Sequence, residues 1–139
     1  MTVPMEYRQA TRDFENFLTA VRDRAGLATT NQTFTMVEGV LRTFRRRLEP
    51  AEAIAFVQIL PACLRALFVH DWDLDEPRRA FGTREDMTRE VKALRPDHNF
   101  STDSAIADMA SVLREMLGTA VMEQALSGLP EEAKRFWFD

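Results

Sequence analysis

Apolar side chains recur every three or four residues along most of this sequence, and this spacing limits the possible folds more than any other feature. A period near 3.6 residues places such side chains on one face of a helix. No segment alternates apolar and polar residues for long enough to indicate a strand. The pattern predicts an all-α fold, a helical bundle of about seven or eight helices. The longest stripe consists of Phe34, Val37, Leu41, Phe44 and Leu48.

Residues that begin and end helices divide these stripes into separate segments. Gly26 follows the first stripe as a C-terminal cap, and the candidates for an N-terminal cap before the longest stripe are Thr29, Thr30 and Asn31. Pro61 breaks or restarts a later stripe, because proline lacks the amide hydrogen that a helix interior needs. We expect one helical domain over residues 13–138, preceded by an N-terminal arm over residues 1–12.

An internal repeat suggests how this domain is organised. Val40-Leu41-Arg42 recurs as Val112-Leu113-Arg114, and Leu60-Pro61 recurs as Leu129-Pro130. The repeat predicts two pseudo-repeated units of three to four helices each, packed so that each buries the apolar face of the other. The units cover about residues 13–70 and 83–138, and a loop over residues 71–82 joins them.

Charge and cysteine content exclude several classes of protein. The chain has 18 basic and 22 acidic residues, a net charge of −4, which disfavours general affinity for nucleic acid. Its single cysteine, Cys63, cannot form an internal disulfide and fits a reducing compartment. No apolar run approaches the roughly 20 residues that span a bilayer, and none near the first residue has the length of a secretory signal. We expect a cytoplasmic protein with no membrane association.

One segment and its repeat are similar to a known family. Leu60-Pro61-Ala62-Cys63-Leu64-Arg65-Ala66-Leu67-Phe68, followed by His70-Asp71-Trp72, resembles a stretch of the bacterial domain of unknown function catalogued as family 2267. The family's usual glycine before the tryptophan is Asp71 here. The second half, through Phe136-Trp137, resembles the family's repeated ending, so the resemblance spans roughly residues 13–138. It implies an all-helical bacterial protein without an established activity, and it supplies no catalytic residues.

Metal-compatible side chains crowd the segment after Phe68. The spacing matches neither a calcium-binding EF-hand loop nor a two-histidine helix motif, so we interpret these residues as loop solvation and helix capping. No metal or cofactor is therefore expected. If a cleft between the two halves binds a small molecule, the residues expected at its mouth are His70, Asp71, Trp72 and His98. Trp72 is otherwise a plug over the end of the bundle.

Two further features have ordinary structural interpretations. The arginines at positions 45 to 47, with Arg42, suit the negative end of a helix dipole, and we interpret them as a solvated face. Cys63 lies among leucines and is interpreted as a buried thiol. The sequence contains no glycine-rich phosphate loop, nucleophile elbow or paired catalytic spacing, so an enzyme is not expected.

The sequence thus leaves two hypotheses about function. The first is a non-enzymatic module that binds another protein, most simply a second copy of itself, with Phe136, Trp137 and Phe138 as the candidate interface. The alternative is a small-molecule binding or sensing protein that uses the cleft between the halves.

Overall fold

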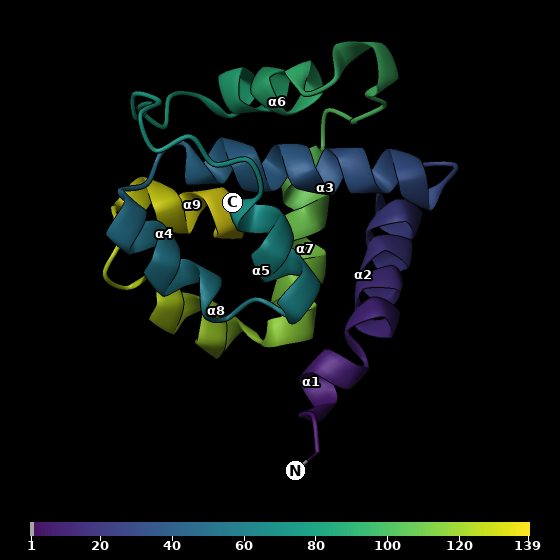
Figure 1. Ribbon diagram of the computed structural model, residues 1–139. Coiled ribbons are helices and arrows are strands. Elements are labelled where there is room, and N and C mark those ends of the chain that lie inside the picture. Colours follow the sequence, from purple (N-terminus) through teal and green to yellow (C-terminus); the bar gives the residue numbers. More distant parts are fainter. Residues whose placement is uncertain (1) are drawn as a thin grey trace.

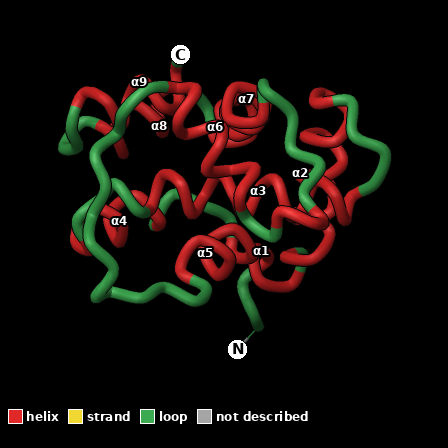
Figure 2. The backbone as a smooth tube through the Cα atoms, turned by 90° about the horizontal axis from the view of Figure 1, so that it is seen from above, coloured by secondary structure: helices red, strands yellow, loops and turns green. Residues whose placement is uncertain are grey.

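The computed structural model describes residues 2–139, and within them the chain is all-helical (Figures 1 and 2). It contains no strand in that range. This confirms the predicted all-α class. The helices are α1 (Met5–Arg8), α2 (Ala10–Ala25), α3 (Thr30–Arg45), α4 (Pro50–Val57), α5 (Ala62–Val69), α6 (Arg84–Ala93), the 3₁₀ turn η1 (Pro96–His98), α7 (Ala105–Leu117), α8 (Thr119–Leu126) and α9 (Glu131–Phe138).

Helix α3 lies at the centre of the molecule. It packs against α2, α5, α6 and α7, and α6 lies as a separate layer on the side opposite α5 and α9 (Figure 1). Of the three candidate caps, Thr29 is the one used, and its hydroxyl accepts a hydrogen bond from the Gln32 amide at 3.1 Å. Gly39 allows α6 to approach closely, since a Cβ atom there would lie 2.9 Å from the Val91 carbonyl oxygen.

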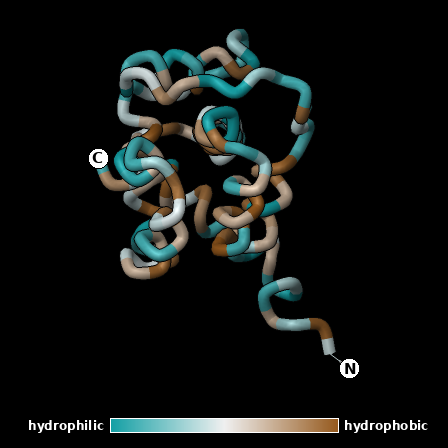
Figure 3. The backbone as a smooth tube through the Cα atoms, turned by 90° about the vertical axis from the view of Figure 1, so that its left-hand side faces the viewer, coloured by the Kyte–Doolittle hydropathy of each residue, from teal (hydrophilic) through white to brown (hydrophobic). Residues whose placement is uncertain are grey.

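The N-terminal residues differ from a simple arm. Residues 10–12 already belong to α2, and only residues 2–9, which we call the α1 segment, precede it. This segment projects from the body of the molecule (Figures 1 and 3). None of the residues of helix α1 itself is buried.

An aromatic cluster joins the first half of the chain to the last helix. Trp137 stacks on Phe56 at 5.6 Å between ring centroids and meets the edge of Phe44 at 5.2 Å. Phe136 packs on Phe44 at 4.9 Å. The prediction that Phe136 and Trp137 form an interface is therefore wrong, because both are core residues with about 1% or less of their surface exposed. Phe138 is half-buried beside them.

The two halves follow the same helical order. Helices α3, α4 and α5 form a long helix followed by two helices of eight residues each, and α7, α8 and α9 do the same. The pseudo-repeat itself, which is a matter of matching sequence and geometry, stays a prediction, as does the superposition of the two units.

Candidate functional site

The predicted cleft residues do not share one cavity. His70 and Asp71 follow α5 and form an exposed pair, with His70 Nε2 3.3 Å from Asp71 Oδ2. Trp72 is half-buried at a different cavity, and His98 is exposed on η1 and lines neither of the two. No group of three or more His, Cys, Asp or Glu side chains within residues 2–139 is arranged to hold a metal ion.

Asp71 has an unusual backbone conformation. Its φ of 53° lies in the left-handed region, which glycine adopts without the steric cost that a Cβ atom adds. The family that the sequence resembles usually has glycine at this position, and the turn explains why. Asp71 also lies 3.8 Å from Arg42 on α3, so its carboxylate helps to hold the turn.

The arginine run at the end of α3 is not a solvated face. Arg45 and Arg47 are buried, and Arg47 pairs with Glu90 of α6 at 2.7 Å. Its guanidinium also donates to the carbonyl oxygens of Thr43 at 2.7 Å and Phe81 at 3.2 Å. The interpretation as a solvated face is therefore wrong for these two arginines. Arg47 thereby ties the end of α3 to α6 and to the central loop, residues 71–82.

Glu90 is the shared anion of this network. Arg46 pairs with it at 3.1 Å and Arg79 at 2.8 Å, in addition to Arg47. Arg46 reaches the central loop as well, with its Nε atom 3.2 Å from Glu76. Three cations around one carboxylate that is only 9% exposed make a charge network that depends on Glu90.

Arg45 is bound differently from its two neighbours. It is 2% exposed, and its Nη1 atom donates to the carbonyl oxygens of Phe68 at 2.9 Å and His70 at 3.0 Å. The guanidinium lies over the ring of Trp72, 5.4 Å from the centroid. Its Nε atom is buried without a hydrogen-bond partner. Burial, with the nearby guanidinium groups of Arg42 and Arg46, lowers the pKa of Arg45 to about 10, so the side chain is still a cation at neutral pH.

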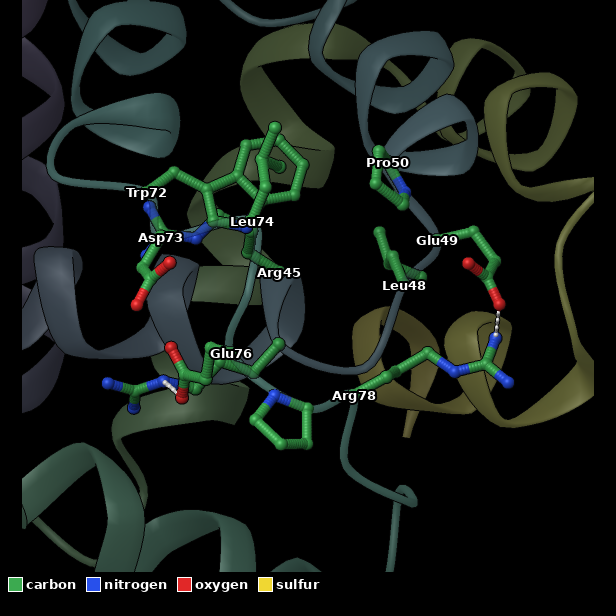
Figure 4. Close-up of a pocket in the computed structure, with 11 residues that line it drawn as sticks. Arg45, Leu48, Glu49, Pro50, Trp72, Asp73, Leu74, Glu76 and Arg78 are labelled. Atoms are coloured by element: carbon green, nitrogen blue, oxygen red, sulfur yellow. Dashed lines mark ion pairs between the residues drawn. The ribbon is translucent and has the colours of Figure 1, made fainter.

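A cavity of about 240 Å³ opens beside Arg45, between the central loop and the junction of α3 and α4 (Figure 4). Apolar side chains and two ion pairs form its walls. The pairs are Arg46–Glu76 at 3.2 Å and Arg78–Glu49 at 2.6 Å. We call this hollow the Arg45 cavity. Its lining residues are Arg45, Arg46, Leu48, Glu49, Pro50, Trp72, Asp73, Leu74, Glu76, Pro77 and Arg78.

A second, more apolar surface lies between α2, α7 and the start of α5. It is an open groove of about 560 Å³, which we call the α2–α7 groove. Met116, at its edge, is 40% exposed. A smaller crevice that includes Glu6 of the α1 segment shares several residues with this groove. The groove is lined by Asp13, Asn16, Phe17, Ala20, Pro61, Val112, Glu115 and Met116.

Cys63 lies at a third surface, beside His70. The thiol is half-buried, and its Sγ atom donates to the Ala10 carbonyl oxygen at 3.6 Å. The same depression is lined by His70, Glu38 and Arg95, together with Phe14 and other apolar residues. The thiol is thus more accessible than the buried thiol that the sequence predicts, although it packs at the edge of the core.

These features define an all-helical protein whose central helix carries a buried arginine cluster. Comparison with known families gives a match to "Uncharacterized conserved protein (DUF2267)" over residues 14–136. The match covers most of the chain, and the protein belongs to this family. No curated protein matches the chain. Within residues 2–139, none of the helices combines the length and apolar character needed to cross a bilayer.

Proposed function

We propose that this protein is a non-enzymatic interaction module that pairs with a second copy of itself. In this proposal the α1 segment of each copy covers the α2–α7 groove of the other. The observation that carries the proposal is the exposure of the α1 segment's apolar side chains. Val3, Met5 and Tyr7 are 58%, 60% and 54% exposed. Removing apolar surface from water is favourable by about 25 cal/mol per Å², so covering these side chains with a second copy stabilises the pair.

The α1 segment is held only at its polar side. Arg65 pairs with Glu6 at 2.7 Å and donates to the Tyr7 hydroxyl at 3.2 Å, and its guanidinium lies 5.7 Å from the centre of the tyrosine ring. Exposed contacts of this kind contribute little to stability. Exchange of the segment between two copies is therefore inexpensive in free energy.

The position of the groove suits a symmetric pair. The crevice at the base of the α1 segment includes Glu6 and shares Asp13, Phe17 and Met116 with the α2–α7 groove. Segment and groove thus form one continuous surface. In a twofold dimer the same surface is used on both copies, so each segment lies against the other copy's groove.

The charges at this surface are complementary. Asp13 and Glu115 provide negative charge at the α2–α7 groove, and Arg8 provides positive charge at the end of α1. A second copy places its Arg8 near the acidic groove. Such complementary charges orient the two partners more than they strengthen the complex.

Light scattering coupled to size exclusion, over a range of protein concentrations, tests the proposal. We expect the mass to rise from one chain to two as concentration increases. Met116→Asp places a charge in the groove and is expected to remain monomeric. The matched control is Ile54→Asp on α4, because Ile54 is 56% exposed and lies outside the groove. A wild-type protein that stays monomeric at all concentrations overturns the proposal, as does equal dimerisation of Met116→Asp.

The compartment is part of the same proposal. We place the protein in the cytoplasm, because a half-buried single thiol at Cys63 is best preserved in a reducing environment.

Small-molecule binding is the second candidate function, and one observation favours it. The Arg45 cavity places a buried cation beside a hollow of about 240 Å³. His70 and His98 take no part in it, so this candidate rests on different residues from those expected at a cleft between the halves.

A further inference from the structure

We propose that the Arg45 cavity binds a small organic carboxylate, with the guanidinium of Arg45 holding the carboxylate group and the apolar walls holding the rest of the molecule. This site is separate from the α2–α7 groove. The inference therefore does not depend on self-association.

The first argument is the missing counter-charge. Arg46 and Arg78, the other two arginines of the cavity, each pair with a carboxylate. Arg45 has none within ion-pair distance among residues 2–139, and its only hydrogen-bond acceptors are two backbone carbonyl oxygens. A buried cation without an anion is costly, since desolvation is not offset by a charge of opposite sign. A bound anion supplies that charge.

The second argument is that part of the Arg45 guanidinium makes no hydrogen bond to residues 2–139. Both hydrogen bonds of Arg45 come from Nη1, and the buried Nε atom has no partner. The two parallel hydrogen bonds that arginine makes to a carboxylate require a planar group with two acceptor oxygens. Nη2 makes no hydrogen bond within residues 2–139 and, unlike Nε, is not fully buried, so it is the nitrogen that a carboxylate in the cavity meets.

The walls of the cavity define the rest of the ligand. Trp72 and Leu74 of the central loop lie on one side and Leu48 and Pro50 on the other (Figure 4). These four side chains provide apolar contacts for the body of the ligand, within a lining in which six of the eleven residues are charged. The volume of about 240 Å³ is below that of sites for drug-sized ligands, so the body is small, close to a single ring.

The acidic residues around the cavity do not exclude an anion. Glu76 and Glu49 are each neutralised by an arginine at 3.2 and 2.6 Å. Asp73 lacks an ion pair, but it is exposed, and its Oδ1 atom accepts a hydrogen bond from the Asp75 amide at 2.9 Å. Arg45 is therefore the dominant charge in the buried part of the site.

Benzoate is the probe that tests this proposal. Trp72 lines the cavity, so its fluorescence reports binding, and Trp72→Phe identifies its share of the signal because Trp137 is the only other tryptophan. We expect saturable binding of benzoate and a rise in melting temperature. Benzamide lacks the charge and acetate lacks the ring. Each is expected to bind at least about tenfold more weakly, benzamide because it loses a charge-assisted contact and acetate because it loses the burial of the ring.

Variants separate binding from stability. Arg45→Met is expected to abolish benzoate binding. Arg114→Met is the matched control, because Arg114 also donates to a carbonyl at the end of a helix, that of Trp137, and lies over an aromatic ring, that of Phe138 at 5.5 Å. Arg114 lies outside the Arg45 cavity. We expect this variant to bind as the wild type does.

A further variant covers the case in which Arg45→Met does not fold. Leu74 is exposed on the central loop, so Leu74→Glu adds a negative charge at the cavity without disturbing the core. We expect it to weaken benzoate at least about tenfold more than Leu74→Gln does. The monomeric Met116→Asp variant is expected to bind benzoate normally. The proposal is overturned if benzoate gives no saturable signal, if benzamide binds equally well, or if Leu74→Glu and Leu74→Gln bind alike.

Discussion

The central loop and the α1 segment both lie outside the packed helices, but the chain holds them in opposite ways. The central loop is rich in charge, and arginines after α3 hold it: the buried Arg47 donates to the Phe81 carbonyl, and the half-buried Arg46 pairs with Glu76. The α1 segment carries exposed apolar side chains and is held by Arg65 alone among the arginines of the helical body.

This difference in how the two regions are held affects what each region can do. A loop that is tied by buried charge keeps its shape, so it can form one wall of a cavity. A segment with uncovered apolar side chains and one exposed ion pair can leave its position on its own copy and bind a second copy at little cost in free energy. The comparison therefore supports the two proposals, ligand binding for the first region and self-association for the second.

The largest effect is expected from Glu90→Gln. This change removes the carboxylate that Arg46, Arg47 and Arg79 share, and leaves the buried guanidinium of Arg47 without an anion. Breaking a buried ion pair in this way costs about 3–5 kcal/mol. Urea denaturation measures the loss of unfolding free energy. Trypsin should also cleave faster after Arg78 and Arg79, because the loop is released.

A neighbouring glutamate provides the control for this variant. Glu85 is exposed on the same helix, so Glu85→Gln is expected to change the unfolding free energy by no more than about 0.5 kcal/mol. If the two variants have equal stability, the central loop is not held by buried charge and the contrast with the α1 segment is lost.

An intermediate effect is expected from Gly39→Ala. The added methyl group would lie 2.9 Å from the Val91 carbonyl oxygen and 3.1 Å from a methyl carbon of the same residue, which forces α6 away from α3. Overpacking of this kind costs about 1–3 kcal/mol. Thermal or urea unfolding measures it. An unchanged or raised stability would show that α6 shifts freely, and that the charge network does not hold it in place.

The smallest effect is expected from Arg65→Ala, which removes the contacts of the α1 segment. Arg65 and Glu6 are both partly exposed, so the loss of unfolding free energy should stay below about 1 kcal/mol. Hydrogen exchange should nevertheless speed up within residues 5–8. Arg22→Ala is a suitable control, because Arg22 pairs only with the exposed Asp23. A loss of several kcal/mol would mean that the α1 segment is an integral part of the fold.

Local features of the fold could be predicted from the sequence. Gly26 ends α2 in the left-handed conformation, and Thr29 begins α3 with its capping hydrogen bond, because both roles depend only on residues within one turn. The all-α class follows from the same periodicity. Helix α2 begins at Ala10, before the predicted domain boundary at residue 13, because Ala10, Thr11 and Arg12 carry no apolar stripe that marks them as helical.

Features that depend on distant residues could not be predicted. Arg45 and Arg47 have the sequence context of surface residues, and their burial depends on carbonyl groups and a carboxylate that lie 23 to 43 positions away in the chain. Phe136 and Trp137 resemble an exposed aromatic tail for the same reason, since Phe44 and Phe56 that cover them are distant in sequence. The Arg45 cavity therefore had no signal of its own beyond Trp72.

Site-specific crosslinking between copies tests the exchange of the α1 segment most directly. In a background with Cys63→Ser, one batch carries Met5→Cys in the segment and another carries Met116→Cys in the groove. After mixing and mild oxidation, the account predicts a disulfide between positions 5 and 116 that joins two chains, identified by mass spectrometry of the linked peptides. A mixture that forms no such link, under conditions where both thiols react with a maleimide, contradicts it.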